Sequence, residues 1–324
     1  MKILVTGAAG FIGFHLCRRL FDMNCEVVGL DNMNSYYDVE LKNLRLSELR
    51  SQNPDFRFFR MDLGEKDTLA ELLESERFDV VCNLAAQAGV RYSIKNPYTY
   101  IDSNVYGFLN LLEGIAHHHK CPLVYASSSS VYGGNDVQPF SEDQKTESPV
   151  SLYAATKKAN ELMAHVYSDM YSLKTVGLRF FTVYGPFGRP DMAYFKFADK
   201  ISAGKPIDVY NYGDMKRDFT YVDDVVAGIV RILFSDFQEK DNYRIYNIGR
   251  GKPESLMDFI GYIEAGLGKK AVLNMLPMQA GDVHETFADV SRLAADFGYS
   301  PSVDLKDGIK EFIDWYKKYT WKKQ

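Results

Sequence analysis

Side chains near the middle of the sequence have the types and spacing needed to move a proton to or from an alcohol. Tyr153 and Lys157 lie four residues apart in Ser151–Tyr171, a segment whose pattern predicts a helix, so both share one helix face. A phenol is a poor base at its ordinary pKa of about 10, but a neighbouring ammonium group favours the phenolate. Such pairs also occur on ordinary helices, so Tyr153 and Lys157 need support from other motifs.

A run of four serines, residues 127–130, follows the apolar segment 123–126. A hydroxyl at the carboxyl end of a buried strand lies where open α/β sheets bind ligands, although serines also suit an ordinary turn. We expect Ser128 to hydrogen-bond the substrate oxygen that Tyr153 also contacts. Its neighbours Ser127 and Ser129 are further candidate substrate contacts.

A glycine-rich turn near the start of the chain predicts a dinucleotide site. Gly7, Gly10 and Gly13 follow the apolar segment 3–6 with the spacing GxxGxxG, which lets the backbone approach a pyrophosphate at the start of the next helix. Asp31 ends the next apolar segment, where a carboxylate accepts hydrogen bonds from the adenosine ribose. Because a carboxylate repels a 2′-phosphate, NAD is favoured over NADP. Further candidate cofactor contacts are Phe11, Ile12, Asn32 and the adenine-flanking pair Asp62 and Leu63.

Apolar, β-rich segments alternate with segments of helical length over the first 180 residues. The expected strands are Ile3–Thr6, Glu26–Asp31, Phe56–Met61, Val80–Ala85, Leu123–Ser127 and Thr175–Phe180. The expected helices are Phe11–Met23, Leu41–Ser51, Asp67–Ser75, Tyr98–His118 and Ser151–Tyr171. This alternation predicts an α/β fold, a doubly wound parallel sheet of the Rossmann type. We expect residues 1–180 to form the NAD-binding domain, with 218–248 returning to it, and 181–324 to form a smaller mixed α/β substrate-binding lobe.

Composition excludes several other classes of protein. The net charge of −5 argues against a nucleic-acid partner, and no run approaches the roughly 20 apolar residues of a membrane span. The four cysteines form no CxxC pair, which favours buried thiols over disulfides or zinc. Consecutive histidines at 117–119 point in different directions on a helix, so no metal site is expected. These features indicate a soluble, cytoplasmic protein.

Taken together, the motifs resemble the extended short-chain dehydrogenase/reductase family, and within it the UDP-glucuronate 4-epimerases. The family motifs are the glycine turn, Asn83–Ala86, Ser130–Gly133, Tyr153 with Lys157, and Arg217–Asp224. The segments closest to the epimerases are Gln87–Ser93, Ser151–Glu161 and Tyr184–Ala193. The similarity extends from the first residues to about Asp289.

The resemblance implies a function: reversible C4 epimerisation of UDP-glucuronate through a 4-keto intermediate and enzyme-bound NAD. Tyr153 would take the proton of the sugar 4-hydroxyl, and Lys157 would tune Tyr153 and hold the nicotinamide ribose. Arg189 would bind the sugar carboxylate, because a guanidinium holds a carboxylate with two hydrogen bonds. The remaining implied contacts are Leu84, Ala85 and Ala86 at the cofactor, and Arg91, Thr182, Arg217 (diphosphate) and Asp282 (uridine ribose) at the substrate. The family also implies a homodimer formed through the helices near Tyr98–His118 and Ser151–Tyr171.

Alternatives stay open within the same fold. One is an epimerase acting on another UDP-sugar, such as UDP-glucose or UDP-N-acetylglucosamine, and another is a UDP-glucuronate decarboxylase. Similar dehydratases and decarboxylases carry an added acid where this chain has Ser129 and Ser130, which disfavours both of those reactions. A non-enzymatic redox sensor or scaffold would be expected to lose the Ser128, Tyr153 and Lys157 set.

Overall fold

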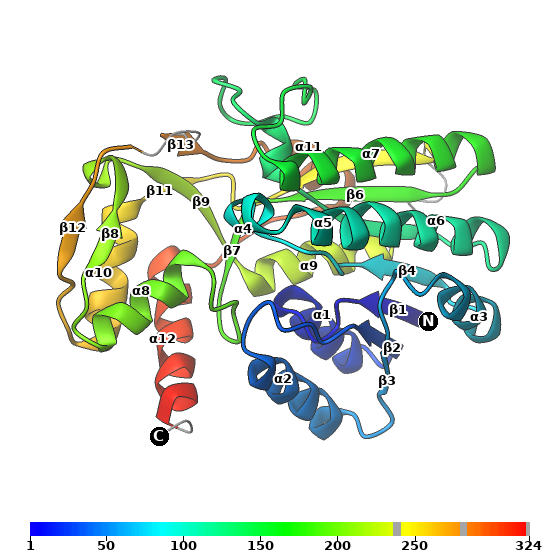
Figure 1. The fold of residues 1–324 in the computed structure, drawn as a ribbon, viewed down its shortest axis with the longest axis horizontal. Coiled ribbons are helices and arrows are strands. Elements are labelled where there is room, and N and C mark those ends of the chain that lie inside the picture. The colour runs from blue at the N-terminus through cyan, green and yellow to red at the C-terminus, as the bar shows by residue number, and fades with distance from the viewer. Residues whose placement is uncertain (236–240, 279–283, 322–324) are drawn as a thin grey trace.

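The computed structural model describes residues 1–235, 241–278 and 284–321, and a seven-stranded parallel sheet lies at its centre (Figure 1). The strands run in the order β10-β6-β5-β4-β1-β2-β3. Their bounds are β1 Lys2–Thr6, β2 Glu26–Asp31, β3 Arg57–Arg60, β4 Val80–Asn83, β5 Leu123–Ser128, β6 Thr175–Phe180 and β10 Tyr243–Ile248. The order reverses between β1 and β4, which creates the crevice where such sheets bind ligands. The predicted doubly wound α/β fold is therefore confirmed.

Helices cover both faces of this sheet, which explains why its strands are apolar throughout. In β1, Ile3 and Val5 belong to one apolar core and Leu4 to the other, as the two-residue period of a strand requires. The first core packs against α1 (Phe11–Asp22), α2 (Val39–Gln52), α9 (Val222–Leu233) and α11 (Ser291–Phe297). The second packs against α3 (Lys66–Glu76), α6 (Gly107–His117) and α7 (Leu152–Tyr171).

A second, smaller region lies beside the carboxyl ends of the central strands (Figure 1). One small sheet joins β7 (Thr182–Tyr184), β9 (Lys216–Tyr221), β11 (Pro253–Ser255) and β13 (Glu285–Thr286), and a second pairs β8 (Ile207–Val209) with β12 (Leu273–Met275). Their helices are α8 (Ala193–Ser202), α10 (Leu256–Leu267) and α12 (Leu305–Trp321). This region has its own aromatic core, in which Phe219 and Phe259 stack with ring centroids 4.3 Å apart.

The chain passes between the two regions several times after residue 180. After β9 in the small sheet, α9 packs against α1, and β10 pairs with β6 in the central sheet. Helix α11 also packs against β10 and α9, although it lies inside the range 181–324. Residues of the second region are therefore tied to the central sheet at several points.

The segment expected to form one helix over Tyr98–His118 is divided in three. It consists of α5 (Pro97–Tyr100), a π-helical turn at Ile101–Tyr106 and α6, and is preceded by α4 (Val90–Lys95). Asn104 lies inside the π turn, where its backbone carbonyl accepts a hydrogen bond from the Asn160 side chain at 2.6 Å. A π turn leaves one backbone carbonyl outside the regular helical hydrogen-bond pattern. Here that carbonyl accepts its hydrogen bond from a side chain of α7.

The cysteine prediction is confirmed, because Cys17, Cys25, Cys82 and Cys121 are all buried and free. Within the described ranges, no helix is both long enough and apolar enough to cross a membrane. The same part of the chain contains no cluster of three His, Cys, Asp or Glu side chains arranged to hold a metal ion.

Candidate active site

The glycine turn between β1 and α1 is so tightly packed that side chains are excluded. Gly7 has a φ of +70°, and a Cβ there would lie 2.8 Å from the backbone nitrogen of Ala85. A Cβ on Gly13 would lie 2.1 Å from the carbonyl oxygen of Gly7. Gly10 precedes α1 and supplies no side-chain cap, so the N–H groups of Phe11 and Ile12 in the first helical turn are available to an anion. The cradle fits a dinucleotide pyrophosphate.

The expected ribose and adenine contacts gather at the end of β2. The buried Asp31 accepts a hydrogen bond from the backbone N–H of Met33 at 2.8 Å. Asn32 donates to Asp62 at 2.6 Å, and both line a pocket of about 340 Å³. Leu63 differs, because its side chain is buried in the second core instead of lining this pocket.

The catalytic candidates meet where β5 ends against α7. The Lys157 ammonium donates to the carbonyl oxygen of Ala126 at 2.9 Å, and the Ser128 hydroxyl lies close enough to the Tyr153 phenol to affect its pKa. Ser128 also accepts from the N–H of Ser130 at 3.2 Å, which fixes the 3₁₀ turn Ser129–Tyr132 that follows. The structure therefore brings together the three residues that the sequence singled out.

Burial changes the pKa values of Tyr153 and Lys157. Burial raises the pKa of Tyr153, although the Ser128 hydrogen bond and the Arg189 charge both oppose the rise. Burial lowers the pKa of Lys157 to about 8. The protein by itself thus holds the phenol protonated, and the cationic nicotinamide ring of NAD⁺ is the additional charge that would favour the phenolate.

Arg189 already holds a carboxylate from its own loop. Its Nε and Nη2 atoms donate to Asp191 at 3.0 and 2.5 Å, and the Tyr36 hydroxyl donates to the same carboxylate at 3.0 Å. Burial alone would raise the pKa of Asp191, but the charge and hydrogen bonds of Arg189 lower it. Arg189 is near enough to Tyr153 for its charge to act on the phenol. The guanidinium is therefore oriented by Asp191.

The other substrate candidates are spread around the junction of the two regions. Thr182 and Arg217 lie on the neighbouring strands β7 and β9, where Arg217 donates to the backbone carbonyl of His284 at 3.1 Å. The Arg91 guanidinium on α4 lies 5.6 Å from the centre of the Tyr210 ring. Asp282 lies outside the described residues. Ser127 is buried, and its hydroxyl donates to Glu161 instead of facing an open site.

Several buried polar residues that position this site were not predicted. Asn104 donates to the carbonyl of Gln87 at 2.9 Å and to Thr156 at 3.0 Å, and so joins the loop after β4 to the catalytic helix. Arg45 donates to the carbonyls of Ala9 at 2.8 Å and Phe187 at 2.6 Å, which links the glycine turn to the loop of Arg189. Their partners lie far away in the sequence, so no local pattern points to them.

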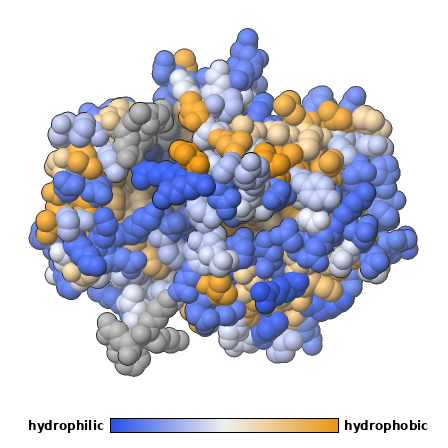
Figure 2. All heavy atoms as spheres, viewed as in Figure 1, coloured by the Kyte–Doolittle hydropathy of each residue, from blue (hydrophilic) through white to orange (hydrophobic). Residues whose placement is uncertain are grey.

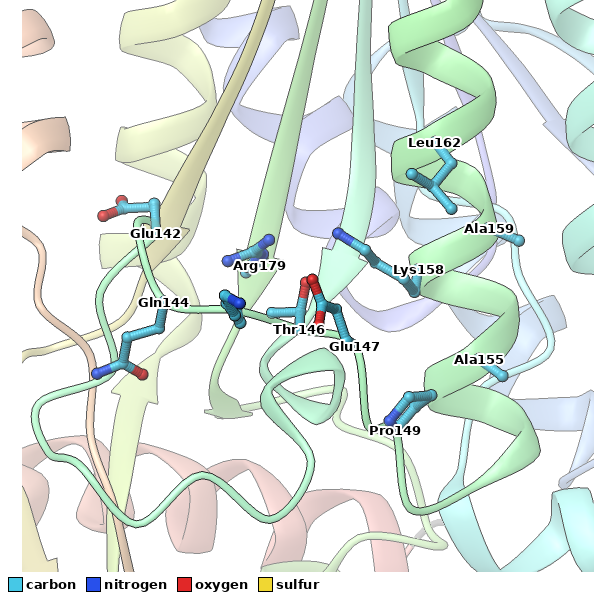
Figure 3. A pocket seen from close by; sticks show the side chains of 11 residues that line it. Glu142, Gln144, Thr146, Glu147, Pro149, Ala155, Lys158, Ala159, Leu162 and Arg179 are labelled. Atoms are coloured by element: carbon cyan, nitrogen blue, oxygen red, sulfur yellow. The ribbon is translucent and has the colours of Figure 1, made fainter.

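A separate pocket of about 600 Å³ opens on the outer side of α7 (Figure 3). Arg179 and Lys158 extend toward it from β6 and α7, and the loop carrying Glu142 to Pro149 covers it. Neither Tyr153, Lys157 nor Ser128 lines this pocket. It is therefore distinct from the place where the catalytic candidates meet.

The fold and the glycine turn define the class, an NAD-dependent enzyme with a doubly wound sheet. The model of the NAD dependent epimerase/dehydratase family matches residues 3–249, and the chain belongs to that family. A probable UDP-glucuronate 4-epimerase of Rhizobium meliloti is 47% identical, over 98% of this chain and 97% of its own. The crystal structure of a Bacillus cereus UDP-glucuronic acid 4-epimerase, in complex with UDP-glucuronic acid and NAD, is 38% identical with a TM-score of 0.90, over 98% of this chain and all of that one. A Thermus thermophilus UDP-glucose 4-epimerase in complex with NAD is 31% identical with a TM-score of 0.82, over 98% and 99% of the two chains.

Proposed function

We propose that this enzyme interconverts UDP-glucuronate and UDP-galacturonate by inverting C4 of the sugar, with NAD retained between turnovers. The observation that carries the proposal is the packing of α7, which carries Tyr153 and Lys157, against the end of β5: Lys157 donates to the carbonyl of Ala126, two residues before Ser128. The similarity to UDP-glucuronate 4-epimerases over nearly the whole chain supports the choice of substrate.

In this proposal the protein moves one proton twice. Tyr153 accepts the proton of the 4-hydroxyl as C4 becomes a ketone, and Ser128 hydrogen-bonds the same oxygen. The glycine turn at Gly7, Gly10 and Gly13 would hold NAD, which would supply the chemistry of accepting the C4 hydrogen as hydride and returning it. Once the ketone has turned its other face, Tyr153 returns the proton to the oxygen, so that no net oxidation occurs. Lys157, held on the carbonyl of Ala126, would bind the nicotinamide ribose and place a positive charge there.

Arg189 would select a sugar acid. Its two hydrogen bonds to Asp191 leave other guanidinium N–H groups for a second carboxylate. A firmly held carboxylate also suits an epimerase, because a 4-keto uronate is a β-keto acid that loses CO₂ readily.

The same ion pair favours a second candidate, the epimerisation of a neutral UDP-hexose. If Asp191 fully satisfies Arg189, a neutral sugar leaves no unpaired charge in the site. The similarity to a UDP-glucose 4-epimerase is in line with this alternative.

Purified protein incubated with UDP-glucuronate, without added cofactor, tests the proposal. We expect a product of unchanged mass that comigrates with UDP-galacturonate in chromatography with mass detection. Loss of CO₂ would make the enzyme a decarboxylase. Turnover of UDP-glucose or UDP-N-acetylglucosamine alone would instead establish the second candidate.

We further infer that two copies pair through α7 and the α5 region. Apolar side chains gather over these helices (Figure 2), and Leu162, Val166 and Met170 on α7 are 57%, 47% and 66% exposed. Tyr98, at the start of the segment beside α7, is 78% exposed. A contiguous apolar face of this kind is typical of an interface. Sedimentation of the wild type should give a dimer, and Leu162→Asp should give a monomer; a wild-type monomer would contradict the inference.

A further inference from the structure

A third residue of α7 reaches the end of β5 beside the catalytic pair. Tyr153, Lys157 and Glu161 are spaced by four residues and lie on one helix face. Tyr153 lies near Ser128, Lys157 donates to the carbonyl of Ala126, and Glu161 accepts the hydroxyl hydrogen of Ser127 at 2.7 Å. The two residues before Ser128 in β5 are therefore each hydrogen-bonded by a side chain of α7.

The Glu161 carboxylate is itself fixed by a buried cation. Its Oε1 accepts from Arg179 Nε at 2.8 Å in addition to Ser127, and its Oε2 accepts from Arg179 Nη2 at 2.9 Å. Glu161, Ser127 and Arg179 are 1%, 2% and 3% exposed. Arg179 also donates to the Tyr132 hydroxyl at 3.0 Å, beyond the catalytic serines. Neither oxygen of the carboxylate can turn without breaking a hydrogen bond.

Such a buried ion pair is poorly explained by stability alone. Removing two charges from water is costly, and apolar side chains of similar size often stabilise a fold equally well. The pair does achieve something that apolar side chains cannot, because it accepts the single hydroxyl proton of Ser127 and so sets that side chain's orientation. Ser128 is the next residue along the chain.

We propose that Glu161, supported by Arg179, is a positioning residue: by holding Ser127 it fixes the end of β5 and so the place of the next residue, Ser128. This inference rests on the proposed function for its substrate. The Glu161 carboxylate makes no hydrogen bond to Tyr153 or to Lys157. It therefore acts through Ser127 and the backbone that joins Ser127 to Ser128.

The test removes both charges of the buried pair; Lys158, which also contacts Glu161 at 3.3 Å, has a partly exposed side chain. Glu161→Leu/Arg179→Met should fold and retain NAD, and its KM should stay close to that of the wild type. Its kcat should fall about tenfold or more, since small displacements of catalytic groups are costly. The pH profile of the remaining activity should keep its midpoint, because Glu161 transfers no proton. An unchanged kcat in a folded double variant would overturn the proposal, and so would a shifted pH profile.

Ser127→Ala keeps the proposal testable if the double variant does not fold. Ser168→Ala is a matched control. Ser168 lies on α7, as Glu161 does, is 1% exposed and shares a 2.7 Å hydrogen bond with Thr175. Both variants should lose similar thermal stability, while only Ser127→Ala should lose kcat. A Ser127→Ala enzyme with raised KM and normal kcat would show direct contact with the sugar and contradict the proposal.

The wild type, assayed in parallel, separates this inference from the proposed function. Failure of the wild type to convert UDP-glucuronate would disprove the proposed function only. The same variants would then be compared on whichever UDP-hexose the wild type converts, with the same expected loss of kcat.

Discussion

Two parts of this site are held by different kinds of contact: the cofactor side, formed by the glycine turn at residues 7–13, and the substrate side, formed around Arg189 and Asp191. The cofactor side depends on close backbone packing, as where a Cβ on Gly13 would overlap the carbonyl of Gly7 six residues earlier. The substrate side depends on side chains that meet across the sequence, such as Tyr36 and Asp191, 155 residues apart. Local spacing therefore specifies the first side, whereas only the folded chain assembles the second. The catalytic pair on α7 lies between them.

The largest effect is expected at the boundary between the two sides. Tyr153→Phe removes the proton acceptor and should lower kcat about a thousandfold, within the usual range for general acid–base catalysis. NAD retention and KM should change little, because both binding sides stay intact. Tyr171→Phe, on the same helix, is the control and should keep wild-type turnover in the chromatographic assay. A Tyr153→Phe enzyme with more than a tenth of wild-type kcat would assign the proton to another group.

A substitution in the glycine turn should lower both the retention of NAD and the stability of the fold. Gly13→Ala forces a Cβ to within 2.1 Å of the Gly7 carbonyl oxygen, and overpacking of this kind costs about 1–3 kcal/mol. We expect the purified variant to lose its bound NAD and to unfold at lower urea concentration. Gly261→Ala is a matched control on α10, because nothing lies within 4 Å of its added Cβ. If Gly13→Ala retained NAD as the wild type does, the cradle would be misassigned.

A substitution of Arg189 should weaken the binding of UDP-sugars that carry a sugar carboxylate. Arg189→Lys keeps the charge but loses the planar fork, so KM for UDP-glucuronate should rise about tenfold, which corresponds to about 1.4 kcal/mol. Inhibition by UDP, which has no sugar carboxylate, should be unchanged. An equal loss of affinity for UDP would place Arg189 at the diphosphate instead.

A smaller, pH-dependent effect is expected at His15, which joins the two sides. Its Nε2 lies 2.9 Å from the carbonyl oxygen of Pro186, and burial lowers its pKa from 6.5 to about 3. The unfolded chain therefore binds the proton first, and the stability of the fold is lost as pH falls from about 6.5 toward 3. Between about pH 7.5 and about pH 5 the loss should be about 1–2 kcal/mol in urea unfolding. His15→Gln keeps a donor for Pro186 and should reduce this difference; an unchanged difference would place the titration elsewhere.

The comparison also explains what the sequence alone could predict. The glycine turn, six of the seven strands of the central sheet and the Tyr153–Lys157 pair follow from residue type and short spacing, and the fold agrees with them, whereas strand β10 was not predicted. The π turn around Asn104 was not predicted, and its carbonyl accepts a hydrogen bond from Asn160, which lies 56 residues away on another helix. The same holds for Asp191 beside Arg189: the sequence shows both residues, but not that Tyr36 helps to hold them together. Ser127 was expected to contact substrate, and its burial against Glu161 depends on how α7 packs on β5.

The central claim is that C4 loses and regains the same hydrogen within one site. The most direct measurement uses UDP-glucuronate carrying deuterium at C4, with purified enzyme and no added cofactor. We expect UDP-galacturonate that keeps the deuterium at C4, observed by mass spectrometry and proton NMR. A product in which the label has been exchanged with solvent would contradict the account.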